Sequence, residues 1–236
     1  IHHTIAWVQT GWVGDKAEDC WLALFVDASF AGDLQDSKST SGAYLCILGP
    51  HTFVPVTWIA KKQGAVSHSS SEAEVIALEA ALRMEGIPAL TLWELVVDTF
   101  GSTVSDKNNK TPRKQKPTER DVTADITAHS VAADIRKILE SVDNVPITIQ
   151  KSSGRTKIII FEDNDAVIKM TCKGRSLNMR HVPRTHRVDL DWLFVIIRED
   201  PGIFSKYINT KLQLGDVFTK GPFTALQWQS LCKMAH

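Results

Sequence analysis

The N-terminal half of the chain contains three apolar runs separated by short turn-forming segments. The runs occupy residues 21–30, 43–48 and 53–60. Apolar, β-rich runs of this length are typical of strands. Gly49-Pro50-His51 separates the last two, because proline is too stiff and lacks the donor to continue a strand. Three consecutive strands with short connections predict an antiparallel meander.

The apolar periodicity then changes to that of helices. Ser69-Ser70-Ser71 precede residues 72–85, where apolar side chains recur at helical spacing. We expect Gly86-Ile87-Pro88 to break this helix, because proline removes a backbone donor, and residues 89–97 to form a second helix.

A polar, basic segment divides the chain. Residues 101–120 combine proline with many charged side chains, which is typical of loops and disordered segments, and residues 122–141 fit a short surface helix. We therefore expect residues 21–236 to form one domain with a polar, partly disordered insertion at about 101–156.

The C-terminal part alternates strand and helix patterns. Residues 157–162 (KIIIFE) form a continuous apolar run of the kind seen in buried parallel strands. Helices are expected at 166–172, 186–199 and 214–234, with a last strand at 203–208. Three hairpin strands followed by two strand–helix units predict an α/β domain with a mixed sheet covered by helices.

Composition and charge narrow the class of protein. The 236 residues are 43% hydrophobic, which excludes global disorder, and 27 basic residues balance 27 acidic ones. Zero net charge counts mildly against a free-standing nucleic-acid binder. The four cysteines are too widely spaced for a zinc or redox motif, and no apolar run could cross a bilayer. With no signal peptide visible, we expect an intracellular protein that is not secreted, and a start without Met suggests a piece of a longer precursor.

Two acidic residues fall at the ends of predicted strands. Asp27 ends the first strand pattern and Asp163 follows the KIIIFE run. Ligands gather at the carboxyl ends of strands in open sheets, so these two carboxylates are expected to be neighbours. Neighbouring carboxylates repel unless a cation compensates, and oxygen-only ligands favour Mg²⁺ or Mn²⁺.

Each acidic residue also has a purely structural interpretation. An aspartate at a strand end is commonly a turn or helix-cap residue. Ser71-x-x-Glu74 matches a capping box, in which Glu74 would reach back to the Ser71 amide. Asp216 could simply complement the dipole of the last helix. Position and composition alone leave these alternatives open.

Four sequence blocks in order resemble the ribonuclease H domain of copia-type (Ty1/copia-like) LTR retrotransposon Pol polyproteins. The blocks are FVDASFAGD with SKSTSG at 25–42, KKQ with SSSEAE at 61–74, EDNDA at 162–166, and LGDVFTK at 214–220. The resemblance implies a ribonuclease H-like fold: a five-stranded mixed sheet, with three antiparallel and two parallel strands, flanked by helices. It also implies that residues 1–20 are the end of the reverse-transcriptase connection.

The same resemblance implies a metal-dependent endonuclease that hydrolyses the RNA strand of RNA–DNA hybrids during reverse transcription. Its catalytic and metal-binding carboxylates would be Asp27, Glu74, Asp163 and Asp216, holding two Mg²⁺ ions for which Mn²⁺ could substitute. Glu74 is preferred to Glu72 because Val-Ile-Ala follows it. We expect Asp216, which rests mostly on the resemblance, to be the most displaced of the four.

Substrate contacts and partners follow from the same blocks. Lys61, Lys62, Arg184 and Lys220 are candidates for binding the hybrid by motif position, although each could be a solvated charge. The implied partners are an RNA–DNA hybrid and the reverse transcriptase domain of the same polyprotein. Two alternatives remain open: a silent domain acting as a structural tether or nucleic-acid-binding module, and a same-fold integrase or transposase.

One block departs from the family pattern. Where the family commonly has Arg-Thr-Lys-His-Ile-Asp, this chain has Arg184-Thr185-His186-Arg187-Val188-Asp189. The histidine is displaced by one position, so no family role can be assigned to it.

Overall fold

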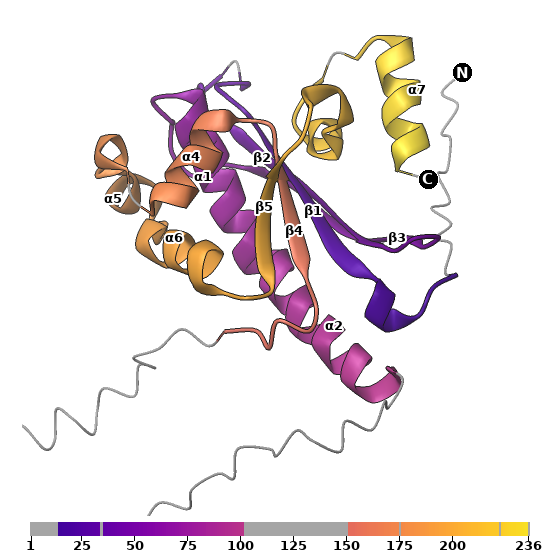
Figure 1. Cartoon of the computed structure of the whole chain (residues 1–236). Helices are drawn as coiled ribbons and strands as arrows, with labels where there is room; N and C mark the ends of the chain where they lie inside the picture. The colour runs from indigo at the N-terminus through magenta and orange to yellow at the C-terminus, as the bar shows by residue number, and fades with distance from the viewer. Residues whose placement is uncertain (1–13, 34, 102–150, 175, 222, 236) are drawn as a thin grey trace, which may run out of the picture. The chain divides into compact units, whose positions relative to one another are not determined.

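A computed structural model describes residues 14–33, 35–101, 151–174, 176–221 and 223–235. Five strands form one sheet in the order β3-β2-β1-β4-β5 (Figure 1). The strands are β1 (Trp21–Ser29), β2 (Thr40–Leu48), β3 (Phe53–Lys62), β4 (Ile158–Glu162) and β5 (Ile203–Tyr207). Strands β1 to β3 pair antiparallel, whereas β4 pairs parallel to both β1 and β5. The predicted five-stranded mixed sheet is therefore confirmed.

Helices cover the sheet face to which Leu24 and Ile158 point. The first is α1 (Ser70–Ala81), which continues through a π-helical turn (Leu82–Gly86) into α2 (Ile87–Phe100). The predicted break at Gly86-Ile87-Pro88 is wrong. The widened turn accommodates Pro88 in the first turn of α2, where a missing donor costs least. Gly86 lies close to the sheet, because an added Cβ would sit 3.2 Å from the Leu24 and Ile158 side chains.

The C-terminal strand–helix units complete this layer with α4 (Asp165–Lys173), α5 (Val182–His186) and α6 (Leu190–Glu199). The predicted helix at 186–199 starts late, at Leu190. Arg187 adopts a left-handed conformation (φ 55°) that interrupts the helix, and Asp189 caps α6 by accepting the Trp192 N–H.

The other sheet face packs against the 3₁₀ helix η5 (Leu214–Phe218) and the C-terminal helix α7 (Ala225–Met234) (Figure 1). Buried side chains of this face include Ala23, Phe25, Tyr44, Cys46, Leu214 and Leu231. Three further 3₁₀ turns are η1 (Ala17–Asp19), η3 (Leu177–Met179) and η4 (Thr210–Leu212). The sheet is thus buried on both faces around β1.

Some predictions fall on residues that the structure does not describe. Most of the expected insertion at 101–156 and the helix at 122–141 lie outside the described residues, as do residues 1–13 of the expected connection. Among the described residues, no helix is long and apolar enough to cross a membrane.

Candidate metal centre

Three aspartates meet where β1, β4 and η5 come together. Asp27 belongs to β1, Asp163 directly follows β4 and Asp216 belongs to η5. Each offers a carboxylate oxygen, and the three oxygens lie within 4.8 Å of one another. Asp216, expected to be the most displaced, therefore lies with the other two.

The absence of a side chain at Gly215 and the hydrogen bond of the Gln213 side chain explain why η5 can bring Asp216 so close to β1. A Cβ at Gly215 would sit 3.0 Å from both the Cβ and the backbone nitrogen of Asp27, so only glycine fits without a shift. Buried Gln213 donates through Nε2 to the Val26 carbonyl at 2.8 Å and fixes the start of η5 on β1. The Thr219 hydroxyl donates to the Asp27 carboxylate.

A second carboxylate group adjoins the first. Oxygens of Glu74 on α1, Glu162 on β4 and Asp163 also lie within 4.8 Å of one another, so Asp163 belongs to both groups. Sequence reasoning did not single out Glu162. The available signal was alternation, because Ile158, Ile160 and Glu162 share one face of β4 and all are fully buried.

The two carboxylate groups lie on opposite faces of the sheet. Asp27 lies on the same face of β1 as Ala23 and Phe25, the face that packs against η5 and α7. Glu162 and Glu74 lie on the side of the sheet that α1 covers. Asp163 joins the two because it lies just beyond the end of β4. The next residue, Asn164, fixes this turn: its N–H donates to Glu162 at 3.1 Å, and its side chain caps α4.

The carboxylates on the α1 side of the sheet have strongly raised pKa values. Burial, followed by the negative charges of Glu162, Asp27 and Asp163, raises the pKa of Glu74 to about 10. Burial is also the main reason that the pKa of Glu162 lies well above its ordinary value. Oε2 of Glu74 and Oε2 of Glu162 are buried and have no hydrogen-bond partner in the described part of the chain. Buried, unpartnered carboxylate oxygens are costly unless a cation or proton neutralises them.

Lys220 partly neutralises the negative charge of the carboxylates beside η5. Lys220 Nζ lies 2.7 Å from Oδ1 of Asp216 and 3.7 Å from Oδ1 of Asp27. Burial alone would lower the pKa of Lys220, but the hydrogen bond to Asp216 and the nearby aspartates raise it. For Asp216, burial and the charge of Asp27 outweigh the lysine, and its pKa rises to about 6.

Glu72 and Glu74 have separate environments. The capping box predicted for Ser71 and Glu74 does not form; Ser69 caps α1 instead and accepts the Glu72 N–H at 3.1 Å. The Glu72 carboxylate reaches back to the His68 N–H at 3.1 Å. Glu74 is therefore free of any capping role and lies with the other carboxylates.

The other predicted nucleic-acid contacts lie at the surface. Lys61 and Arg184 are exposed, on β3 and α5. Lys62 pairs with Asp33 at 2.5 Å and with Asp36 at 2.9 Å, which reduces the charge it can offer to a phosphate.

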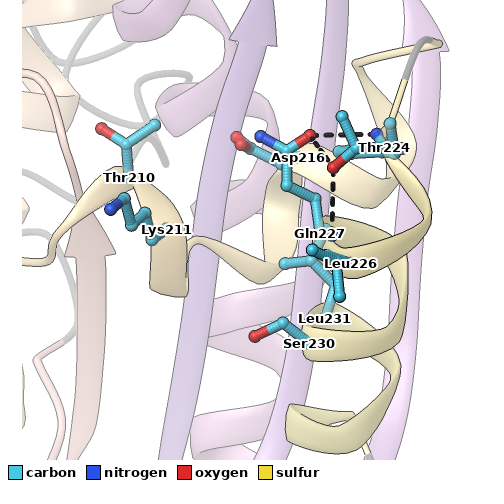
Figure 2. A pocket seen from close by; sticks show the side chains of 9 residues that line it. Thr210, Lys211, Asp216, Thr224, Leu226, Gln227, Ser230 and Leu231 are labelled. Carbon is cyan, nitrogen blue, oxygen red and sulfur yellow. Dashed lines mark hydrogen bonds between the residues drawn. The ribbon is translucent and has the colours of Figure 1, made fainter.

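An open pocket of about 490 Å³ adjoins Asp216 on the α7 side. Figure 2 shows Asp216 at one end of it, with side chains of α7 along one wall and Thr210 and Lys211 of η4 opposite. Thr224 and Gln227 cap α7 at its rim by mutual hydrogen bonds. Asp216 is one of the residues that line the pocket, so the pocket lies directly beside the carboxylate set.

The donor set suits hard divalent cations. All five carboxylates offer oxygen only, two oxygens are buried without partners, and Asp163 is available to both groups. Mg²⁺ prefers such oxygen ligands, and a shared carboxylate is the arrangement found in two-metal sites. The residues therefore fit two Mg²⁺ or Mn²⁺ ions.

Two retrovirus-related Pol polyproteins of Arabidopsis thaliana share sequence with this chain. The polyprotein from transposon RE2 is 47% identical over 59 residues, and that from transposon RE1 is 44% identical over 59 residues. Each match covers 25% of this chain and 4% of the relative, so the chain spans only a small part of either polyprotein. The predicted resemblance to copia-like Pol polyproteins is confirmed over that segment. No family model matches the sequence.

Two solved ribonuclease H structures are similar at low identity. The N-terminal RNase H domain of Rv2228c from Mycobacterium tuberculosis, solved as a fusion with maltose-binding protein, is 8% identical with a TM-score of 0.40, covering 91% of this chain and 98% of that one. LC11-RNase H1, isolated from compost, is 9% identical with a TM-score of 0.36, covering 92% and 99%. The ribonuclease H-like fold of this chain is defined by its own strand order and pairing.

Proposed function

We propose that this chain is a ribonuclease H-type endonuclease that hydrolyses the RNA strand of RNA–DNA hybrids during reverse transcription of a retrotransposon. The observation that carries the proposal is the convergence of Asp27, Glu74, Asp163 and Asp216 at one end of the sheet. The Pol polyprotein names of the two relatives support the retrotransposon context, and the names of the two solved structures agree with the activity.

The carboxylates divide into two ligand groups. Asp27, Asp163 and Asp216 would hold one Mg²⁺ ion, and Glu74, Glu162 and Asp163 the other. Bound Mg²⁺ supplies charge stabilisation at the phosphate and lowers the pKa of water. Asp163 fixes the spacing of the two groups because its carboxylate is common to both.

The remaining polar side chains orient this set. Thr219 donates through its hydroxyl to one oxygen of Asp27, and Lys220 Nζ lies 3.7 Å from the other. Lys220 contributes positive charge beside Asp216 and Asp27. Its hydrogen bond to Asp216 favours the ionised form of that carboxylate and so opposes the rise in the Asp216 pKa that burial causes. Lys61 and Arg184 are the exposed basic residues that we assign to the phosphates of the hybrid.

A cleavage assay tests the proposal. Purified protein is incubated with a hybrid whose RNA strand is end-labelled, with Mg²⁺ or with EDTA, beside double-stranded DNA and double-stranded RNA. The matched variants are Asp27→Asn and Asp165→Asn. Asp165 belongs to the same sequence block as Asp163, but its side chain is 70% exposed and pairs with Lys169.

We expect Mg²⁺-dependent cutting of RNA in the hybrid alone, lost in Asp27→Asn and retained in Asp165→Asn. Equal activity in the two variants would reject the site. Hybrid binding without cleavage under any metal condition would instead identify a silent nucleic-acid-binding module.

A further inference from the structure

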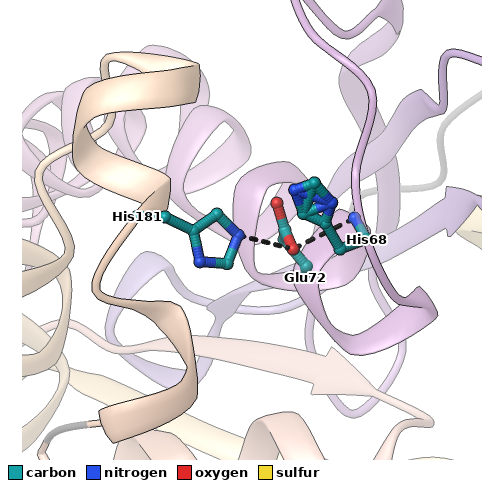
Figure 3. Close-up of side chains that lie close together, drawn as sticks. All are labelled: His68, Glu72 and His181. Carbon is teal, nitrogen blue, oxygen red and sulfur yellow. Dashed lines mark hydrogen bonds and ion pairs between the residues drawn. The ribbon is translucent and has the colours of Figure 1, made fainter.

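A second cluster of metal-binding side chains surrounds Glu72, outside the carboxylate set. His68 precedes α1, Glu72 lies in its first turn, and His181 precedes α5. One ligand atom of each lies within 4.8 Å of the other two. Figure 3 shows the two imidazole rings approaching the Glu72 carboxylate from two sides. We propose that His68, Glu72 and His181 bind a Zn²⁺ ion that ties the start of α1 to α5.

The distance between two of the three candidate ligand atoms already matches that of a zinc site. Nε2 of His181 lies 3.1 Å from Oε2 of Glu72. Two ligand atoms on a tetrahedral Zn²⁺, with bonds of about 2.0–2.1 Å, lie about 3.3 Å apart. The rings of His68 and His181 have centroids 4.9 Å apart, so both can turn a nitrogen toward the same point. Binding would require the three ligand atoms to approach from within 4.8 Å to the spacing of a tetrahedral site.

The ligand carboxylate is held in place from two directions. The His68 N–H donates to Oε2 of Glu72 at 3.1 Å, and Nε2 of His186 lies 3.1 Å from Oε1. Nδ1 of His186 is buried without a partner among the described residues, so the proton of this imidazole belongs on Nε2, where it binds Oε1. A hydrogen bond to the second oxygen of a ligating carboxylate is the usual outer-shell support of a metal site.

The solvent exposure and the ligand types of this cluster favour a different ion from the one that suits the carboxylate set. The His181 side chain is 39% exposed and His68 is exposed, whereas Glu72 is buried at the base of the cluster. An ion can enter from solvent and keep a water as its fourth ligand. Two imidazole nitrogens and one carboxylate suit Zn²⁺, whereas the oxygen-only set suits Mg²⁺.

The consequence would be structural. The ion would join two segments that are far apart in sequence, the turn before α1 and the short helix α5. Helix α5 carries Arg184, and α1 carries Glu74. Zinc would thereby fix the position of a basic surface residue relative to the helix that supplies a carboxylate ligand.

Metal titration of the full chain tests this site without reference to cleavage. Co²⁺ serves as a spectroscopic substitute for Zn²⁺, titrated in excess Mg²⁺ so that the oxygen-only set is filled. The variants are His181→Ala, His68→Gln, His186→Gln and the carboxylate-site variant Asp163→Asn. His51→Ala, in the β2–β3 turn, is a matched histidine control. Circular dichroism and thermal unfolding in EDTA report whether each variant folds.

We expect one equivalent of Co²⁺ with a four-coordinate absorption spectrum, displaced by Zn²⁺ and raising the melting temperature. His68→Gln and His181→Ala should lose this spectrum while folding in EDTA, and Asp163→Asn and His51→Ala should retain it. His186→Gln should bind about 10- to 100-fold more weakly, as expected for an outer-shell partner. Absence of the spectrum in the wild type, or its loss in Asp163→Asn alone, would overturn the proposal.

Discussion

Glu72 and Glu74 lie two residues apart on α1, yet their carboxylates lie in contrasting environments, one rich in hydrogen-bond donors and one rich in other carboxylates. Two residues correspond to about 200° around a helix, so the side chains point to opposite sides. Glu72 accepts a backbone N–H from His68 and faces the imidazoles of His181 and His186. Glu74 faces other carboxylates and retains an unpartnered oxygen. The first environment supplies its own donors, whereas the second requires a cation, and this contrast separates the two candidate sites.

Removing the carboxylate common to both ligand groups should have the largest effect. Asp163→Asn weakens both groups at once, so we expect hybrid cleavage to fall by at least about 10³-fold, equivalent to several kcal/mol of lost transition-state stabilisation. Single-turnover rates on an end-labelled hybrid measure this. Asp165→Asn is the matched control, and a similar loss there would mean that the block matters only for folding.

Replacing Glu74 should separate activity from stability. Glu74→Gln should lower cleavage by about 10²-fold, because one ligand group loses a charge. In the metal-free protein it should be stabilising at pH 7, by on the order of 1–3 kcal/mol. The raised pKa of Glu74 means that the wild type loses stability as pH rises from its ordinary range toward about 10. Urea unfolding in EDTA should show this gain at pH 7 and none near pH 4; a pH-independent difference would contradict it.

Replacing Glu72 should shift stability in the other direction. Glu72→Gln weakens charge-assisted hydrogen bonds to His181 and His186, so we expect a loss of about 1–3 kcal/mol at pH 7. The same urea unfolding series measures it beside Glu74→Gln. If both glutamine variants changed the free energy of unfolding in the same direction, the proposed contrast between the two glutamates would be wrong.

Glu162, which the sequence analysis did not single out, provides a finer test of the second ligand group. Glu162→Gln removes one carboxylate charge from the group that contains Glu74 but leaves Asp163 in place. We expect the Mg²⁺ concentration for half-maximal cleavage to rise about tenfold, with a smaller change in the maximal rate. Titrating Mg²⁺ in the cleavage assay measures both, and an unchanged Mg²⁺ requirement would exclude Glu162 as a ligand.

The smallest expected effect is on the affinity for the RNA–DNA hybrid. Lys61→Gln should weaken hybrid binding modestly and reduce the slope of log affinity against log salt by about 0.7–0.9, the value for one phosphate contact. Fluorescence anisotropy across a salt series measures this. Lys151→Gln is the control, because Lys151 pairs with Glu199 at 2.9 Å. Equal slopes for both variants and the wild type would remove Lys61 from the interface.

The strands could be predicted from the sequence because buried strands require runs of apolar residues. Residues 157–162 predicted β4, and three turn-separated runs predicted the meander. The helix boundaries were less readable. Pro88 predicted a break, but the π-helical turn before it allows one continuous helix to remain packed on the sheet. The late start of α6 depends on the left-handed conformation of Arg187, which no local pattern indicates.

The candidate sites show the same limit. The positions of Asp27 and Asp163 at strand ends followed from pattern, and motif resemblance added Glu74 and Asp216. Glu162 ends an apolar run and resembles an ordinary polar strand terminus until β4 is paired with its neighbours. His68 and His181 meet only because the chain folds α5 against the start of α1. Contacts between distant segments depend on tertiary packing, which local patterns do not encode.

The central claim is that the carboxylate set, with Asp163 shared, holds the divalent ions used for cleavage. The most direct measurement is an anomalous difference map from crystals of the full chain grown with Mn²⁺ and a non-cleavable RNA–DNA hybrid. We predict two peaks beside the scissile phosphate, both bonded to Asp163, one also bonded to Asp27 and Asp216 and the other to Glu74 and Glu162. Peaks that do not contact Asp163, or Mn²⁺ found at His68, Glu72 and His181 alone, would contradict the claim.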